Sequence, residues 1–158
     1  MFEPIWSPDG RRLVCVQGFS GSVLIDLTKP LAARLPRPLP MASRGVKPFF
    51  VYSWSPDGRR LAGAIWSSGL GVYSFATGSY ETVADHGRGA FWLSDSRRLL
   101  YTHDGRVFLL DSVTRAVQEV LAPPPFSRIT SVSASPDDRT LYVVRATEEG
   151  DVWMLTLR

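Results

Sequence analysis

The chain has 158 residues, a formal net charge of +3 and a sequence pI near 9.3, and all but two of its 18 basic residues are arginines. With 44% hydrophobic and 21% charged residues, the composition excludes a disordered chain, and no apolar run approaches the ~20 residues that a membrane helix needs. A lone cysteine, Cys15, excludes an intrachain disulfide framework and a cysteine zinc site. The 12 prolines and 13 glycines count against long helices and favour a β-rich domain.

An eight-residue block recurs along the chain and defines its organisation. The sequence WSPDGRRL stands at Trp6–Leu13 and again at Trp54–Leu61, and degraded copies stand at Trp92–Leu99 and Ala134–Leu141. The interval between blocks is roughly 40 residues, which is typical of repeat architectures. Because identical eight-residue blocks do not arise by chance in so short a chain, the sequence consists of repeated units.

Each block is followed by the same succession of short segments. An apolar run follows the block, then a turn rich in Gly, Ser or Asp, and then a second apolar run. In chain order the first runs are 14–16, 62–66, 100–102 and 142–146, the second runs are 23–27, 71–75, 107–111 and 152–157, and more polar third runs stand at 31–35, 80–84 and 117–121. Short β-branched and aromatic runs separated by turn residues predict the strands of an all-β fold.

One stretch also fits a helix. Residues 106–122 contain neither Gly nor Pro and carry apolar residues at helical spacing. The equivalent stretches of the first two units contain Pro30 and Gly78, which would break a helix. The register therefore favours strand, turn and strand over a helix in residues 106–122.

The centre of each block predicts a hairpin turn. Ser, Pro and Gly at the first, second and fourth positions are the preferences of a type I β-turn, and an Asp side chain at the third bonds nearby backbone. We interpret these Asp residues as turn-forming rather than catalytic or metal-binding. In the third block Leu and Ser replace the Ser–Pro pair and Ser replaces Gly, which leaves its turn type open. The predicted turn residues are Ser7, Pro8, Asp9, Gly10, Ser55, Pro56, Asp57, Gly58, Ser94, Asp95, Ser135, Pro136 and Asp137.

Four short strands in about 40 residues match one blade of a β-propeller. WSPDGRRL followed by two apolar strands resembles the WD-repeat-like propeller repeat of TolB-type proteins. Similar repeats occur in prolyl-oligopeptidase-type serine peptidases and in propellers appended to bacterial Ser/Thr kinases and regulators, and residues 134–158 resemble the closing segment of such appended propellers. We therefore expect a single partial β-propeller over 1–158, with antiparallel blades at about 1–36, 49–85, 88–122 and 128–158 and a Pro-rich interblade loop at 36–48.

The strand count predicts an incomplete ring. The last unit supplies strands at 129–134, 140–146 and 151–157 and lacks an outer strand of its own. Three interpretations stay open: the C-terminal part of a larger propeller, which we favour, a half-ring that pairs with a second copy, or a compact four-bladed propeller. In the first two, the faces of the first and last blades would be exposed apolar surface available for self-association.

No catalytic motif is recognisable in the sequence. Gly18–Gly21 is one residue short of G-x-S-x-G, Gly is never followed by Lys, and H-E-x-x-H does not occur. Cys15 lies in an apolar run, which favours a buried, inert thiol. His86 and His103 both fall in turns, where solvated side chains are expected; a shared metal site would require their two loops to lie on the same face. We predict no catalytic residue, no cofactor and no metal site.

The sequence also contains recurring arginine pairs and one proline-rich stretch. The first arginines of the pairs, Arg11, Arg59 and Arg97, recur in register and predict a band on one rim that is a candidate binding surface. Each pair adjoins an Asp and the net charge is modest, so we expect solvated, ion-paired residues and no nucleic-acid partner. Pro36–Pro40 predicts an extended linker, with recognition by a proline-binding module as the alternative.

The sequence thus predicts a non-catalytic propeller module whose loops and central channel bind a protein or a small ligand. The resemblance implies a TolB-like sensor or interaction part of a larger bacterial protein. The alternative is the gating propeller of a prolyl-oligopeptidase-type serine peptidase without its hydrolase domain. This frame carries no export signal, which indicates the cytoplasm, whereas the TolB resemblance points to the periplasm.

Overall fold

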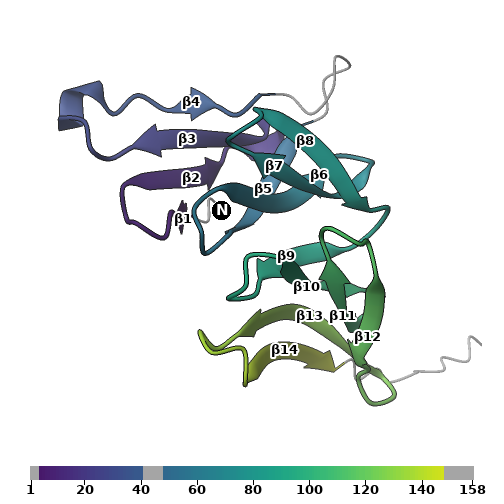
Figure 1. Cartoon of the computed structure of the whole chain (residues 1–158). Coiled ribbons are helices and arrows are strands. Elements are labelled where there is room, and N and C mark those ends of the chain that lie inside the picture. The colour runs from purple at the N-terminus through teal and green to yellow at the C-terminus, as the bar shows by residue number, and fades with distance from the viewer. Residues whose placement is uncertain (1–3, 41–47, 148–158) are drawn as a thin grey trace, which may run out of the picture.

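The computed structural model describes residues 4–40 and 48–147, which form four antiparallel sheets in chain order (Figure 1). We call these sheets blades 1 to 4. Blade 1 holds β1 (Pro4–Trp6), β2 (Arg12–Val16), β3 (Ser22–Asp26) and β4 (Arg37–Pro38), and blade 2 holds β5 (Phe49–Trp54), β6 (Arg60–Ile65), β7 (Gly69–Ser74) and β8 (Ser79–Ala84). Blade 3 holds β9 (Arg88–Trp92), β10 (Arg98–His103), β11 (Arg106–Asp111) and β12 (Val117–Leu121). The described part of blade 4 holds β13 (Ser127–Ala134) and β14 (Leu141–Thr147), and the strand predicted at 151–157 lies outside the described residues.

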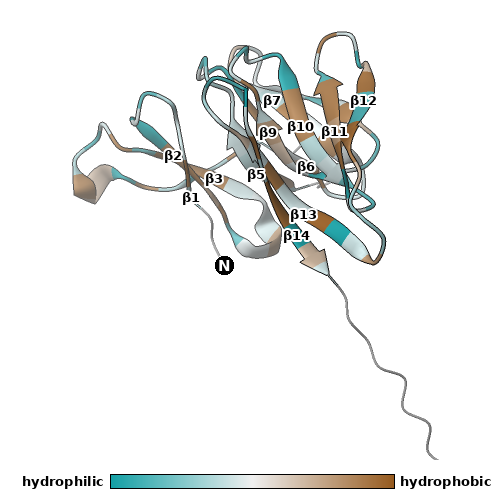
Figure 2. Ribbon diagram, turned by 90° about the horizontal axis from the view of Figure 1, so that it is seen from below, coloured by the Kyte–Doolittle hydropathy of each residue, from teal (hydrophilic) through white to brown (hydrophobic). Residues whose placement is uncertain are grey.

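The hydrophobic core lies between the blades. The first strands of successive blades contact one another, so β1, β5, β9 and β13 lie innermost and the sheets fan outward from them (Figure 1). Separate clusters of buried side chains fill the joints between blades 1 and 2, 2 and 3, and 3 and 4. Figure 2 shows hydrophobic residues along the strands. Because both faces of an inner blade are covered, β6 and β10 carry nearly continuous apolar runs rather than an alternating pattern.

Residues 106–122 form two strands, which confirms the predicted strand, turn and strand. The Asp111 carboxylate accepts hydrogen bonds from the backbone N–H groups of Val113 and Thr114, at 2.9 and 3.0 Å. Arg115 adopts a positive φ of 65° and closes the turn. These local contacts favour a turn over the helix that the apolar spacing also permits.

The predicted outer strand of blade 1 is wrong in position. Leu31–Ala33 forms a 3-10 turn after Pro30. The outer strand is β4, which pairs with β3 and lies within the proline-rich segment expected to be an interblade loop. Pro38 is compatible with this strand because β4 is the outermost strand of its sheet, where a missing N–H costs no ladder bond. Leu39 then buries its side chain between blades 1 and 2.

An arginine clamps each of the first two joints between blades. The Arg12 guanidinium lies 4.8 Å from the centroid of the Trp54 ring and donates to the Gly58 carbonyl at 3.2 Å. The Arg60 guanidinium repeats this arrangement 4.7 Å from the Trp92 ring and donates to the Ser96 carbonyl. The second arginine of a block therefore covers the tryptophan of the next block through a cation–π contact.

The third joint uses different contacts. The fourth block has Ala134 in place of tryptophan, and Arg98 turns to its own block, where its Nε lies 2.5 Å from Asp95 Oδ2. Blade 3 instead joins blade 4 through Ser94, whose backbone N–H and hydroxyl donate to the Asp138 carboxylate at 3.1 and 2.6 Å. The arginine clamp is thus made only where a tryptophan ring receives it.

The helical segments of residues 4–40 and 48–147 are three-residue turns, and none has the length to cross a bilayer.

Candidate binding face at the loop end of the blades

The strand order divides the connections between two ends of the blades. In an antiparallel sheet successive connections lie at opposite ends, so the SPDG turns and their equivalents share one end, which we call the turn face. The connections between second and third strands, at 17–21, 66–68 and 104–105, share the other end with the interblade connection 85–87. We call this end the loop face. Residues distant in the sequence meet there.

On the turn face, the serine of each SPD sequence organises its turn. Its hydroxyl donates to the aspartate two residues later and accepts the backbone N–H five residues later, the latter at 2.9 Å in all three turns. In the third block the Ser96 N–H bonds to the Leu93 carbonyl at 3.0 Å and Ser96 adopts a positive φ of 55°. This turn therefore has the form of the others despite its changed sequence. The serine–aspartate contacts are Ser7–Asp9 at 2.5 Å, Ser55–Asp57 at 2.6 Å and Ser135–Asp137 at 2.6 Å.

These hydrogen bonds hold the pKa values of the turn aspartates below the usual 3.8. For Asp9 and Asp137 the largest cause is the serine hydroxyl, which favours the carboxylate. For Asp57 burial acts in the opposite direction and is outweighed by the Ser55 hydroxyl and the Arg59 N–H. We propose that these carboxylates serve the turns rather than a ligand.

Acid should therefore weaken the fold. A folded-state pKa below the unfolded value means that the unfolded chain binds protons more readily, so stability present above about pH 5 is lost progressively as the pH falls below about 4. Urea unfolding midpoints at pH 7, 5, 4 and 3 measure this. We expect Asp57→Asn to be less stable at pH 7 and to lose less on acidification. A wild-type midpoint that stays constant from pH 5 to pH 3 would contradict the assignment.

The three arginines predicted to form a rim band lie exposed on the turn face. Arg11 and Arg59 are solvent-exposed, and Arg97 forms an ion pair with Asp111 at 2.6 Å. The Arg97 guanidinium is the main cause that lowers the pKa of Asp111 far below its usual range. We propose the band of Arg11, Arg59 and Arg97 as a second candidate binding surface.

Aromatic side chains gather on the loop face of blades 1 and 2. Phe19, in the connection of blade 1, has 85% of its surface exposed, and Trp66, in the connection of blade 2, has 52% exposed. Their rings meet edge to face with centroids 6.3 Å apart, and Phe50 lies 5.8 Å from Trp66. We call Phe19, Phe50 and Trp66 the aromatic cluster. Sequence reasoning missed it, although two of its members are large aromatics in or beside predicted turns.

A cavity of about 780 Å³ adjoins this cluster. Phe50, Tyr52 and Trp66 line one part of it, the interblade connection contributes His86, and the first residue of β9 contributes Arg88. Partial burial raises the pKa of the Tyr52 hydroxyl. The cavity therefore combines apolar walls with a few polar groups, which is the usual character of a binding pocket.

The two histidines meet on the same face. The rings of His86 and His103 lie against each other with centroids 3.9 Å apart and planes tilted by 33°, and Asp104 Oδ2 lies 3.2 Å from His103 Nε2. The requirement for a shared metal site, that both loops lie on one face, is thus met. However, no group of three His, Cys, Asp or Glu residues placed to hold a metal ion exists within 4–40 and 48–147. A cavity of about 690 Å³ beside the pair extends the loop face toward blade 4, where Arg128 and Thr130 line it.

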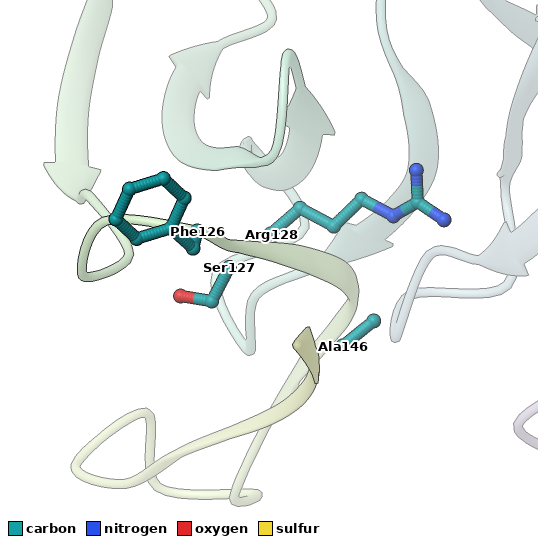
Figure 3. Close-up of a pocket in the computed structure, with 4 residues that line it drawn as sticks. All are labelled: Phe126, Ser127, Arg128 and Ala146. Atoms are coloured by element: carbon teal, nitrogen blue, oxygen red, sulfur yellow. The ribbon is translucent and has the colours of Figure 1, made fainter. Parts of the chain in front are cut away.

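A smaller hollow of about 260 Å³ lies where blade 4 begins. Figure 3 shows its four lining residues, with the Phe126 ring and the Arg128 side chain pointing to opposite sides. Phe126 is 87% exposed and Ser127 donates to the Pro124 carbonyl at 2.7 Å. Its few lining residues make it a weaker candidate than the larger cavity beside the aromatic cluster.

Comparison with solved structures decides the architecture. The chain is similar to the structure of a putative TolB from Agrobacterium tumefaciens, with a TM-score of 0.70 and 19% sequence identity over 90% of this chain and 53% of that one. It is also similar to the β-propeller domain of Cps50 (Swd1) from Myceliophteria thermophila, with a TM-score of 0.60 and 18% identity over 89% of this chain and 47% of that one. The fold is a β-propeller. No family model matches the sequence, and no curated protein matches it.

The chain spans about half the length of these two propeller structures. At identities below 20% they establish the fold and leave the activity of this propeller to be argued from its own surface.

Proposed function

We propose that this β-propeller is a non-catalytic module that binds a protein partner through its loop face. The observation that carries the proposal is the aromatic cluster. Large aromatic side chains are enriched at the centres of protein interfaces, because they bury much area at little conformational cost. Phe19 and Trp66 are exposed on adjacent blades and contact each other, so they form one anchor surface beside a cavity.

The TolB-like resemblance of the repeat supports a role in a bacterial assembly, as one part of a larger propeller protein. The polar side chains beside the aromatic cluster would orient the bound protein. Arg88 and His86 line the cavity next to the aromatic walls, where they supply charge and hydrogen bonds at the rim of the apolar contact.

Photo-crosslinking tests the proposal. We expect benzoylphenylalanine in place of Phe19 to crosslink one defined protein in cells, and Trp66→Ala to weaken binding of that protein about 10-fold or more, as loss of an interface anchor does. The control places the same photo-crosslinker at Val113, which is 66% exposed in a connection on the turn face. Equal crosslinking from positions 19 and 113, or none from position 19, would contradict the proposal that the loop face binds the partner.

A further inference from the structure

Trp6 of blade 1 has the position of the clamped tryptophans. It pairs with Leu13 in the sheet as Trp54 pairs with Leu61 and Trp92 with Leu99. All three therefore stand at the same place in their blades, at the end of the first strand and directly before the turn.

The exposure of Trp6 differs sharply from that of its equivalents. Trp6 is 58% exposed, whereas Trp54 is 7% and Trp92 is 3% exposed. Each buried ring carries an arginine from the preceding blade, and within the described residues no arginine lies over Trp6. The turn that follows Trp6 has the same hydrogen bonds as the turn whose Gly58 carbonyl accepts from Arg12.

We propose that the Trp6 face of blade 1 binds a further propeller blade whose second strand begins with an arginine. That arginine would stack on the Trp6 ring and donate to the Gly10 carbonyl, as Arg12 does at Trp54 and Gly58. The partner is thus defined by its chemistry. It is an antiparallel blade that carries the WSPDGRR type of block, adjoining blade 1 in the same ring.

A second copy of this chain does not meet the requirement. Blade 4 would present its own block to Trp6, and Thr140 stands where the arginine is needed. The Thr140 backbone N–H bonds to the Ser135 hydroxyl at 2.9 Å, as the N–H groups of Arg12 and Arg60 bond to their serines. Its side chain has no guanidinium to cover a ring. The third joint shows the complementary case, since Arg98 makes no such contact where Ala134 replaces tryptophan.

The test appends the expected partner to the full chain. A second copy of residues 48–87, which carries its own Arg60, is joined ahead of Met1, and the protein is labelled with 5-fluorotryptophan. Trp6→Phe identifies the Trp6 resonance in the ¹⁹F NMR spectrum. We expect Trp6 to lose most of its H₂O/D₂O isotope shift in the extended protein and to approach the shifts of Trp54 and Trp92.

Two matched variants change only the appended copy. Arg60→Thr, which reproduces the residue of the fourth block, should restore the Trp6 isotope shift, whereas Arg59→Thr should leave Trp6 protected. Persistence of a fully accessible Trp6 in the extended protein overturns the proposal. Sedimentation of the unextended chain at several concentrations gives an independent readout, for which we expect no self-association through Trp6. Dimerisation that Trp6→Ala abolishes would assign the face to a second copy and overturn it as well.

Discussion

Replacement of Trp92 by alanine should lower the free energy of unfolding by about 3–5 kcal/mol, the usual cost of removing a large aromatic side chain from a core. Trp92 is 3% exposed and belongs to the cluster that joins blades 2 and 3. The change removes both the apolar contacts and the ring that receives the Arg60 guanidinium at 4.7 Å. Urea unfolding followed by circular dichroism measures the loss.

Two further variants separate the ring from the arginine. Trp92→Phe keeps an aromatic face and removes a buried indole N–H that has no hydrogen-bond partner among the described residues, so we expect a smaller loss than for alanine. A double-mutant cycle of Arg60→Ala with Trp92→Ala should give a coupling of about 1–2 kcal/mol, as expected for a desolvated cation–π pair. Additive losses would show that the clamp contributes nothing beyond its separate contacts.

The second large effect is expected at Gly69, where β7 begins beside the aromatic cluster. Gly69 has a φ of +88°, and a Cβ there would overlap the Ala84 carbonyl oxygen and the Asp85 backbone. Left-handed backbone costs a side chain about 1–2 kcal/mol, and overpacking adds about 1–3 kcal/mol. We therefore expect Gly69→Ala to lower the free energy of unfolding by about 3 kcal/mol in the same urea measurement.

Gly78 supplies the matched control. Its φ of +65° is also left-handed, but a Cβ there would meet no atom within 4 Å. Gly78→Ala should therefore cost only the backbone contribution of about 1 kcal/mol. An equal decrease in the free energy of unfolding for the two variants would mean that the close approach of β8 to Gly69 adds nothing to the cost of a side chain there.

The sequence predicted the repeated parts of the fold well because their contacts are local. The block of Trp54–Leu61 contains the serine, the aspartate and the backbone groups that bond one another within five residues. Such a unit specifies its own turn wherever it occurs. The third block forms the same turn with Ser96 at the left-handed position, so the backbone preference tolerates the loss of glycine there.

The position of β4 could not be predicted in the same way. Leu31–Leu35 occupies the place of the outer strand in its repeat, whereas the proline-rich segment after it has the composition of a loop. The strand forms in the proline-rich segment because Leu39, directly after it, buries its side chain in the joint with blade 2. The cluster that receives Leu39 is formed by residues distant in the sequence, of which Phe49 is the nearest. An edge strand also accepts proline, which a pattern based on strand propensity penalises.

The candidate site was the least predictable part. Phe19 and Trp66 come from different repeats, and the contact of His86 with His103 joins an interblade connection to the end of β10. None of these pairs is local. Each depends on which end of the blades a loop occupies, which follows only when the sheets are assembled.

The sequence by itself determined the repeat and the turns of the three SPD blocks, because the repeat is written in identical residues and short-range hydrogen bonds and turn preferences set those turns. Only the tertiary structure decided which side chain each arginine of the pairs contacts. Arg60 and Arg98 occupy the same place in similar blocks, yet Arg60 covers a tryptophan and Arg98 pairs with its own aspartate. The difference lies in the neighbouring blade, where Trp92 offers a ring and Ala134 does not. A side chain at a blade joint can take its partner from the adjacent repeat, as Arg60 does, so its own repeat alone does not decide the contact.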